Sequence, residues 1–292
     1  MPIWIEWFVY LISFIFWILP LKIRWWIGSF LGWLWFDVLK IRRFTIMWNL
    51  RVVFPQLSWE ERLKIARRSM KLLCFTLPEF LTLPMLSKRW FDEHVEFHGL
   101  ENYESALKKN KGVLLLSLHL GNGDIGVAAM AMRGMKVNLI SKKFSNKVLN
   151  SIWWGIREKK GAKFIDAHGK KNAFEILSRL KKNESVVFVI DQYMATPYGI
   201  KSTFFGRTTG TAYGLALFHI KTEAPVLPIY TYRDENLKTH LVFGPEINLE
   251  SAENQDLQIQ RMTEKYNRKV EELILKYPEN WMWVHRRWKK WR

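Results

Sequence analysis

Cysteine, acidic residues and flexible linkers are all scarce in this sequence of 292 residues. The single cysteine, Cys74, excludes an intrachain disulfide and a cysteine-ligated metal cluster, which indicates a reducing compartment. No Gly/Ser-rich tract, internal repeat or low-complexity segment interrupts the chain. We therefore expect one full-sized domain with a modest appendage, and not two large domains.

Cationic and aromatic side chains, in contrast, are abundant. Lys and Arg number 45 against 27 Asp and Glu, which gives a net charge of +18, and the chain contains 16 Trp. Tryptophan favours membrane–water interfaces because its ring is apolar while its N–H needs a polar partner. The composition therefore predicts an anionic partner such as lipid headgroups, nucleic acid or an acidic protein, with a merely soluble basic protein as the alternative.

The N-terminal segment is strongly apolar. Residues 3–21 carry one charge, Glu6, and a helix of that length spans about 28 Å, close to the thickness of a bilayer core. The first cations, Lys22 and Arg24, follow the segment, so the positive-inside rule places the rest of the chain in the cytoplasm. We predict a retained membrane anchor at 1–24, an interfacial helical segment at 25–49 and one main domain at 50–292. A helix lying flat on the membrane, or buried in the fold, is the alternative.

Strand-like and helix-like segments alternate along the rest of the chain. A capping box formed by Ser58 and Glu61 predicts a helix over 59–75. Apolar runs of strand length occur at 113–118, 137–140, 163–165, 186–190, 226–230 and 241–243, and helical patterns at 125–132, 145–159, 171–181, 211–221 and 257–277. The alternation predicts an α/β fold in which helices flank a largely parallel central sheet, with the reactive edge at the carboxyl ends of the strands.

One pair of residues has the types and position needed for acid–base chemistry. His119 and Asp124 follow the apolar strand at 113–118 in the pattern H-x4-D, and Gly121 and Gly123 would permit the turn that a contact between them requires. In this arrangement Asp124 would orient the ring and leave one nitrogen to take a proton. No serine lies in a G-x-S-x-G motif, so the nucleophile would be a hydroxyl of the substrate.

The same region allows other interpretations. Chance matches to H-x4-D are frequent, so His119 could be a structural histidine. Gly121, Gly123 and Gly126 also spell G-x-G-x-x-G, with lysines after the next strand that would suit NADP, which makes a nicotinamide oxidoreductase a rival function. His94 and His98 are spaced like metal ligands, but their segment alternates like a strand, which favours a structural role.

Motifs along almost the entire chain resemble those of one enzyme family. The stretch at 119–124, HLGNGD, is similar to H-x-G-N-W-E, and the ending at 278–289 is similar to P-x-x-W-x-W-x-H-x-R-W-K. Further matches are an R-x5-N-L and F-P element at 43–55, a D-Q pair at 191–192 and an F-F-G at 204–206. Together these segments resemble the late acyltransferases of lipid A biosynthesis, the lauroyl and myristoyl transferase family, within the glycerol-phosphate acyltransferase superfamily.

The chain departs from the family pattern in two places. Asp124 and Gly123 stand where the family usually has Glu and Trp, which shortens the carboxylate arm by one methylene. The family's Y-R-P element is replaced by residues 140–144, where Lys142 and Lys143 could contact phosphate as flexible point charges or be merely solvated. Recognition of the acceptor headgroup therefore does not transfer directly from the family.

The resemblance implies an enzyme that transfers a fatty acyl chain from a thioester, on acyl carrier protein or coenzyme A, to a hydroxyl of a membrane lipid such as a lipid A precursor. It implies His119 as general base and Asp124 as its partner, no metal or other cofactor, and a cytoplasm-facing domain at the bacterial inner membrane. The expected substrate-binding residues are Gly121, Asn122, Lys142, Lys143, Asp191, Gln192, Phe205 and Gly206.

The charge of +18 further favours an acidic acyl carrier protein as donor and an anionic membrane surface as support, with no nucleic acid expected. A lysophospholipid or glycolipid acyltransferase that uses acyl coenzyme A is the nearest alternative. An NADP-dependent oxidoreductase and a membrane-bound RNA-binding protein are more distant ones.

Overall fold

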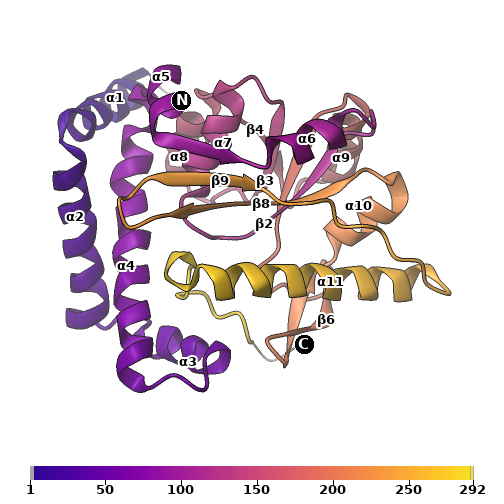
Figure 1. The fold of residues 1–292 in the computed structure, drawn as a ribbon. Coiled ribbons are helices and arrows are strands. Elements are labelled where there is room, and N and C mark those ends of the chain that lie inside the picture. Colours follow the sequence, from indigo (N-terminus) through magenta and orange to yellow (C-terminus); the bar gives the residue numbers. More distant parts are fainter. Residues whose placement is uncertain (1–2, 290, 292) are drawn as a thin grey trace.

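The computed structural model describes residues 3–289 and 291 and places a seven-stranded sheet at the centre (Figure 1). The sheet order is β1-β9-β8-β2-β5-β3-β4. Neighbouring strands are parallel except for the antiparallel pair β8 and β9. The strands are β1 (Val95–His98), β2 (Val113–Ser117), β3 (Val137–Ser141), β4 (Lys163–Asp166), β5 (Ser185–Val189), β8 (Val226–Arg233) and β9 (Thr239–Phe243).

Two apolar cores lie on opposite faces of this sheet. Successive side chains of β2 alternate between them, so that Leu114 and Leu116 join one core while Val113 and Leu115 join the other. The first core includes apolar residues of α3 (Arg43–Val53), α4 (Trp59–Thr82), α9 (Asn172–Lys181), α10 (Gly214–Thr222) and α11 (Gln255–Lys276). The second includes residues of α5 (Lys88–His94), α6 (Leu100–Leu107), α7 (Gly123–Met132) and α8 (Lys147–Glu158). The predicted α/β fold with a mostly parallel sheet flanked by helices is confirmed.

The elements predicted from the sequence agree with the structure, with local differences. All six predicted strands are present, and the Ser58–Glu61 capping box begins α4, which continues to Thr82. Thr211 is not the start of a helix, because it lies in the hairpin of β6 (Gly199–Phe204) and β7 (Arg207–Ala212). The proposed domain boundary at residue 50 falls inside α3. The short 3-10 and π-helical segments are Leu34–Val38, Leu83–Met85 and Pro278–Asn280.

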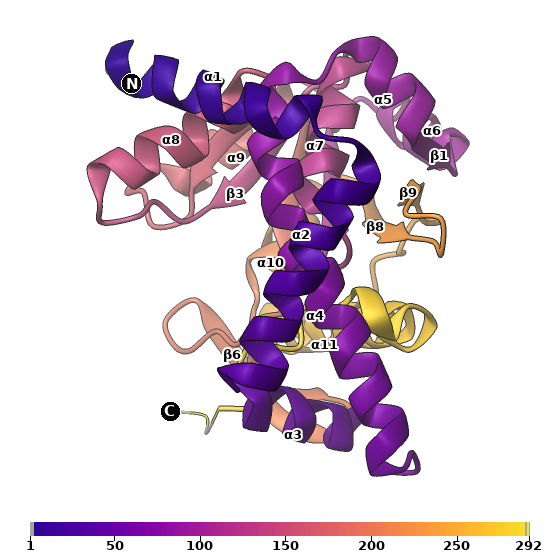
Figure 2. The same ribbon diagram turned by 90° about the vertical axis from the view of Figure 1, so that its left-hand side faces the viewer.

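The apolar N-terminal segment is bent and not one straight helix. α1 (Ile3–Ile18) stops before Pro20, and the two helical stretches Glu6–Ile18 and Leu21–Val38 meet at 108° (Figure 2). Proline lacks a backbone N–H and disfavours the helical conformation in the residue before it, so it breaks the helix here. Among the described residues no single helix is long and apolar enough to cross a membrane, although the bent pair together meets the criteria of length and composition. The prediction of one continuous helix over residues 3–21 is therefore wrong, because the chain bends at Pro20 and a second helix follows.

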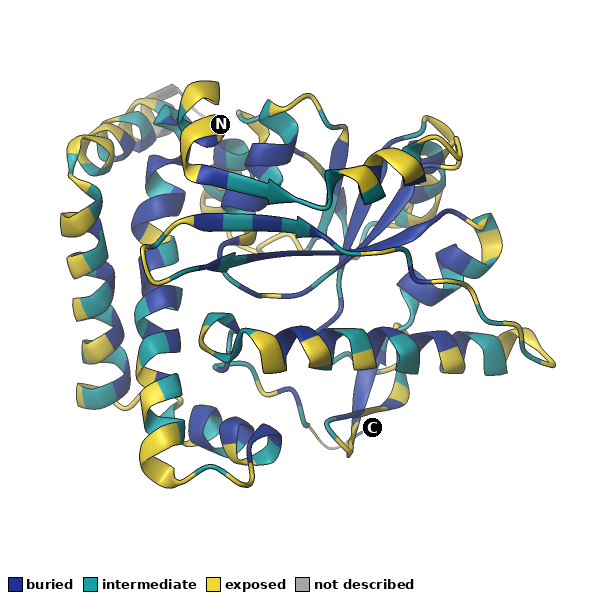
Figure 3. Cartoon of the chain, viewed as in Figure 1, coloured by how far each residue is buried: buried dark blue, intermediate teal, exposed yellow. Residues whose placement is uncertain are grey.

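α2 (Leu21–Trp33) packs closely along α4 through two glycines. A Cβ atom on Gly28 would lie 2.6 Å from the Phe75 Cα, and one on Gly32 would lie 2.8 Å from the Met70 carbonyl oxygen. Helices approach this closely where small residues recur every fourth position, because side chains no longer separate the backbones. The small-residue face of α2 is thereby used for packing, whereas Trp26, Phe30 and Trp33 of the same helix are exposed. Figure 3 shows exposed residues recurring along α2.

Candidate active site

His119 and Asp191 meet because they follow neighbouring parallel strands. β2 and β5 pair in register, with Ser117 opposite Val189, and each strand is followed within two residues by one member of the pair. His119 Nδ1 lies 2.8 Å from Asp191 Oδ1, and the His119 backbone N–H donates to Oδ2 at 3.1 Å. The predicted reactive edge at the carboxyl ends of the strands is where the structure places this pair.

Asp191 is a buried carboxylate held in its ionised form. Its side chain is 2% exposed, and besides His119 it accepts a hydrogen bond from Trp281 Nε1 at 2.7 Å. Burial alone would raise the pKa of Asp191, but the charge of His119 and the hydrogen bonds outweigh it and lower the pKa to about 2. Asp191 therefore stays negatively charged through the physiological range and fixes the adjacent imidazole.

The His119 ring is suited to accept a proton from a bound molecule. Withdrawal from water acts to lower the pKa of His119, but the charges of Asp191 and Asp124 outweigh it, so the pKa is raised above its ordinary value of 6.5. With Asp191 ionised, the Nδ1 atom carries the proton and Nε2 keeps its lone pair. The side chain is 41% exposed, and Gln192 Nε2 lies 3.3 Å from His119 Nε2.

Asp124 does not orient the ring as the sequence had suggested. Its carboxylate forms a bidentate ion pair with Arg157 of α8, with N–O distances of 2.6 and 3.1 Å. Asp124 is in the first turn of α7, where its side chain faces α8, whereas the His119 ring is bonded by Asp191 from the neighbouring strand end. Asp124 therefore acts on His119 through its charge, and the opposite charge of Arg157 acts against that effect.

The turn after His119 depends on Gly121 and not on Gly123. Gly121 has φ +61°, and a Cβ atom there would lie 2.6 Å from the Thr231 carbonyl oxygen. Gly123 begins α7 outside the left-handed region and has nothing within 4 Å of its ideal Cβ position. Asn122, which lies between the two glycines, accepts hydrogen bonds from the backbone N–H groups of Asp124 and Ile125 and so caps α7.

The two glycines provide a matched pair of test variants. Gly121→Ala should destabilise the protein by roughly 1–3 kcal/mol or more, because alanine would be strained at this φ and would collide with the β8 backbone. Gly123→Ala should be neutral or stabilise by about 0.4–1 kcal/mol, since the site is open and the unfolded chain loses freedom. Thermal unfolding of both variants in detergent tests this expectation. Equal midpoints for the two variants would contradict this description of the turn.

A buried ion pair is hydrogen-bonded to the loop that contains Asn122. Asn122 Nδ2 donates to Glu79 Oε2 at 2.9 Å, and the other Glu79 oxygen is paired with Arg233 of β8. The Glu79 and Arg233 side chains are 4% and 5% exposed. A buried pair of this kind is costly to break because the remaining charge would be left without a partner. Asn122, predicted to bind substrate, thus has its amide engaged within the protein and positions the loop.

The C-terminal segment is hydrogen-bonded to the loop at 119–122, which we call the catalytic loop. Gly121 N donates to Asn280 O at 2.9 Å, and Met282 N donates to His119 O at 3.1 Å. Asn49 of α3 in turn donates to the carbonyl oxygens of Trp283 and His285, each at 2.8 Å. The two strings singled out at opposite ends of the sequence, 43–50 and 278–289, therefore dock on each other and hold His119 in place.

An apolar cavity of about 340 Å³ opens beside this pair. His119, Asp124 and Arg157 lie on its lining together with apolar side chains of the sheet and of the surrounding helices, among them Leu72, Leu139, Trp153, Val187, Ile229 and Leu241. A mostly apolar pocket with a few polar groups is typical of sites for small ligands, and this one is of a kind that suits a hydrocarbon chain. The reacting end of such a ligand would lie against His119.

Six of the eight predicted substrate-binding residues lie outside the cavity lining. Two of them, Asp191 and Gln192, contact His119, and the other four have different roles. Lys142 is exposed, and Lys143 contacts Asp166 at 3.5 Å and lies over the Trp154 ring. Phe205 and Gly206 have φ values of +49° and +69° and form the turn between β6 and β7. Positive φ at both central residues is the signature of a tight hairpin turn, so the F-F-G string has a structural explanation.

Comparison with known proteins identifies the family of this chain. The model of the family described as bacterial lipid A biosynthesis acyltransferase matches residues 1–290. The chain belongs to that family. Among its relatives, the lipid A biosynthesis palmitoleoyltransferase of Escherichia coli (strain K12) is 25% identical over 98% of this chain and 91% of its own. The lauroyltransferase of the same organism is 24% identical over 93% and 87%.

Two further similarities extend beyond lipid A. The phosphatidylinositol mannoside acyltransferase of Mycobacterium tuberculosis is 25% identical over 53% of this chain and 50% of its own. The crystal structure of the 1-acyl-sn-glycerophosphate acyltransferase PlsC from Thermotoga maritima aligns with 85% of this chain and 97% of its own at 13% identity, with a TM-score of 0.35.

Membership of the family makes this chain an O-acyltransferase that acts on a lipid. The rival oxidoreductase and RNA-binding interpretations are set aside on that ground. Two of the three glycines of the G-x-G-x-x-G string have structural explanations in this acyltransferase: Gly121 makes the turn, and Gly126 packs against Thr231.

Several residues that contact or support His119 and Asp124 in the structure were not identified from the sequence. Arg157, Glu79, Arg233 and Trp281 carried no local signal for the roles that they have here. Asp191 had such a signal, since it directly follows a predicted strand, as His119 does.

Proposed function

We propose that this acyltransferase moves a fatty acyl chain from acyl carrier protein to a hydroxyl of a lipid A precursor, with His119 as general base. The observation that carries the proposal is the His119–Asp191 pair, whose histidine lines the apolar cavity. The cavity supplies the volume for the acyl chain, and the pair supplies the acid–base chemistry at its end. Asp191, and not Asp124, orients the base in this scheme.

The reaction needs one proton carrier and no protein nucleophile. His119 Nε2 takes the proton of the acceptor hydroxyl as that oxygen attacks the thioester carbonyl, and Asp191 stabilises the imidazolium that forms. When the tetrahedral intermediate collapses, the C–S bond breaks and the imidazolium returns the proton to the leaving thiolate. The new ester and the free thiol then leave, and His119 is neutral again.

Oxyanion stabilisation is best sought at the start of α7. The Gly121 N–H donates to Asn280 O, so it is already engaged within the protein. α7 begins at Gly123 beside His119, and the N–H groups of Asp124 and Ile125 are capped by Asn122. The helix therefore acts through the partial positive charge of its N-terminus, which favours a developing oxyanion. The Asp124–Arg157 pair lines the same cavity, and its net charge is close to zero, so it preserves this favourable field.

Membrane attachment is proposed for the exposed apolar faces of α1 and α2. On α2 the exposed residues are Ile23, Trp26, Phe30 and Trp33, whose spacing of three to four positions puts them on one face. α1 has a similar face with Trp4, Trp7, Leu11, Phe14 and Ile18. Such faces suit helices that lie in the membrane interface, and the charge of +18 adds attraction to anionic lipid. We place the enzyme at the cytoplasmic side of a bacterial inner membrane.

A fourfold surface variant tests this attachment. Replacing Trp7, Phe14, Trp26 and Phe30 by Gln should move much of the protein from the membrane fraction into the soluble fraction. Each large apolar side chain withdrawn from water contributes roughly 1.5–3 kcal/mol, and these four are 47–76% exposed in the free protein. Phe174→Gln, on the exposed face of α9, serves as the control. Unchanged sedimentation with vesicles of anionic phospholipid would contradict the attachment.

The donor and the acceptor are tested together with the purified enzyme. Acyl carrier protein and coenzyme A thioesters of the same chain are each offered with a lipid A precursor and with a lysophospholipid, and the products are identified by mass. Transfer from the carrier protein to the lipid A precursor, with a rate that falls as salt rises, is the expected result, because a strongly cationic enzyme attracts an acidic carrier. Turnover only with acyl coenzyme A would overturn the donor assignment.

A glycolipid other than lipid A is the second candidate acceptor. The similarity to the mycobacterial phosphatidylinositol mannoside acyltransferase favours it, since that relative is named for a different lipid. Acylation of a phosphatidylinositol mannoside but not of the lipid A precursor, in the same assay, would select this candidate.

A further inference from the structure

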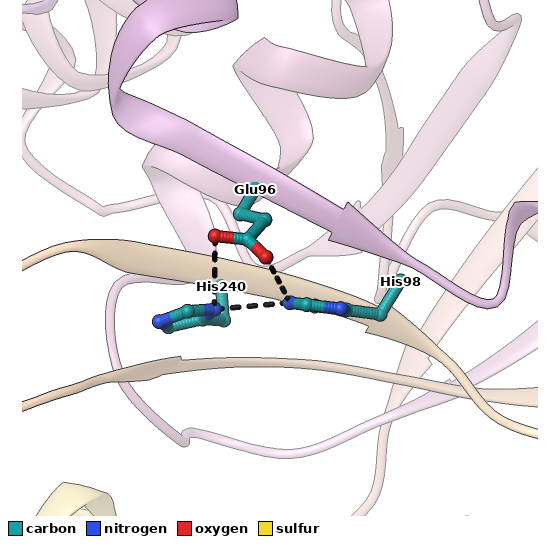
Figure 4. Close-up of side chains that lie close together, drawn as sticks. All are labelled: Glu96, His98 and His240. Carbon is teal, nitrogen blue, oxygen red and sulfur yellow. Dashed lines mark hydrogen bonds and ion pairs between the residues drawn. The ribbon is translucent and has the colours of Figure 1, made fainter.

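Three potential metal ligands gather at the edge of the sheet that lies beyond β8. Glu96 and His98 are two positions apart on β1 and therefore share one face of that strand. His240 of β9 lies directly opposite Glu96 in the parallel register of the two strands. Figure 4 shows the three side chains turned toward one another on that face. None of them lines the cavity of the proposed active site.

The separations of the ligand atoms fit a tetrahedral metal ion. His98 Nε2 lies 3.0 Å from His240 Nδ1, while Glu96 Oε1 lies 3.6 Å from the former and Glu96 Oε2 lies 4.0 Å from the latter. Ligands bound to zinc at about 2.0–2.1 Å with tetrahedral angles are about 3.3 Å apart. One ligand atom from each residue lies within 4.8 Å of the other two, so a rotation of the Glu96 carboxylate and small shifts of the rings would let them surround one ion. Solvent would supply the fourth position.

The His240 ring is already oriented as a ligand. It stacks on Tyr232 at a centroid distance of 4.5 Å and an interplanar angle of 9°, which fixes its plane. Its Nε2 atom lies 3.3 Å from Asp234 Oδ2. If Nε2–H donates to this carboxylate, the lone pair of Nδ1 faces His98 and Glu96. A carboxylate behind a histidine is the usual outer support of a metal ligand, because it fixes the tautomer and raises the basicity of the ring.

Lys238 competes for one of the ligands. Its Nζ lies 2.6 Å from Glu96 Oε2, so in the absence of an ion this lysine neutralises the carboxylate. The Lys238 side chain is 45% exposed and can turn into solvent. Metal binding would therefore displace Lys238, and removal of the lysine should favour the metal.

We propose that Glu96, His98 and His240 bind one divalent transition-metal ion, best suited by zinc, with Asp234 supporting His240. Two imidazoles and one carboxylate favour zinc over magnesium or calcium, which prefer oxygen ligands. The ion would fasten the edge strand β1 to the β8–β9 hairpin. On β8 the same hairpin holds the catalytic loop, through the hydrogen bond from Thr231 Oγ1 to Leu120 O at 2.8 Å.

Metal titration of the tag-free full-length protein in detergent tests the proposal. After treatment with a chelator and desalting, the protein should bind one equivalent of Zn²⁺ and unfold at a higher temperature with it, whereas Mg²⁺ and Ca²⁺ should have no such effect. Co²⁺ should give the absorption bands of a tetrahedral site. No binding of Zn²⁺ in competition with a chromogenic chelator would overturn the proposal.

Variants locate the ion. His98→Ala and His240→Ala should abolish the stoichiometric binding, and His94→Ala, an exposed histidine on α5, should leave it intact. Asp234→Asn should weaken binding by roughly 10–100-fold, as is usual for outer partners of metal ligands. Lys238→Ala should tighten it. Circular dichroism checks that each variant is folded, and one equivalent bound by both folded His98 and His240 variants would overturn the assignment.

Discussion

Replacing His119 by alanine should reduce acyl transfer by roughly 10²–10⁴-fold or more, without loss of folding or membrane attachment. The ring lines the apolar cavity, and Asp191 holds it with one nitrogen directed away from the carboxylate. Its side chain is 41% exposed, so its removal leaves no large buried void. Initial rates of transfer at saturating donor and acceptor, together with circular dichroism, measure both parts of this expectation.

A matched histidine variant distinguishes loss of the catalytic base from a nonspecific effect of removing a histidine side chain. His94 is exposed on α5, where its ring stacks on Trp90 and its Nδ1 atom lies 3.0 Å from the Trp90 carbonyl oxygen. His94→Ala should keep the normal rate. Near-normal transfer by a well-folded His119→Ala protein would show that another group acts as the base.

Asp191→Asn should have the second largest effect, a loss of roughly 10²–10⁴-fold in kcat/KM. Asparagine keeps the size of the side chain and still accepts the hydrogen bond from Trp281, but it removes the charge that stabilises the imidazolium. It can also present an N–H to the ring and so favour the wrong tautomer. The equivalent change in a serine-protease triad costs about 10⁴-fold for that reason.

The pH dependence of kcat/KM identifies the cause of that loss. A general base works in its neutral form, so activity falls as the pH drops through the pKa of His119, which lies above 6.5 in the intact protein. Without the charge of Asp191 the pKa of His119 is lowered, and the acid limb of the profile should move to lower pH. Asp124→Asn should move it less, since Asp124 does not hydrogen-bond the ring and is neutralised by Arg157. If the acid limb of the pH profile does not move in the Asp191→Asn variant, Asp191 has only a structural role.

The order of the elements could be predicted because it depends on local patterns. Apolar runs and a capping box located the strands and the start of α4, and alternation of strand and helix indicated a parallel sheet. The placement of His119 at the reactive edge followed from the same argument. The proline that causes the bend, Pro20, is visible in the sequence, but the continuous hydropathy of the segment suggested a single helix. Hydropathy does not indicate where a helix changes direction.

The partner of His119 could not be read from spacing alone. Asp124 is five residues away, but a helix begins between the two residues and directs its side chain toward Arg157. Asp191 is separated from His119 by 72 residues and meets it only because β2 and β5 are neighbours in the sheet. The order of strands in a parallel sheet depends on long-range packing, which no local pattern specifies. The hydrogen bond from Trp281 to Asp191 could not be predicted from the sequence for the same reason.

Mass spectrometry of lipids from the native bacterium tests the central claim most directly. Cells that lack the gene should accumulate a lipid with one acyl chain fewer than the parent strain. Expression of the intact protein or of His94→Ala should restore the missing chain, and His119→Ala, present at the same level in the same membranes, should not. A lipid profile that is unchanged by the deletion, or restored equally by His119→Ala, would contradict the account of this protein as an acyltransferase whose base is His119.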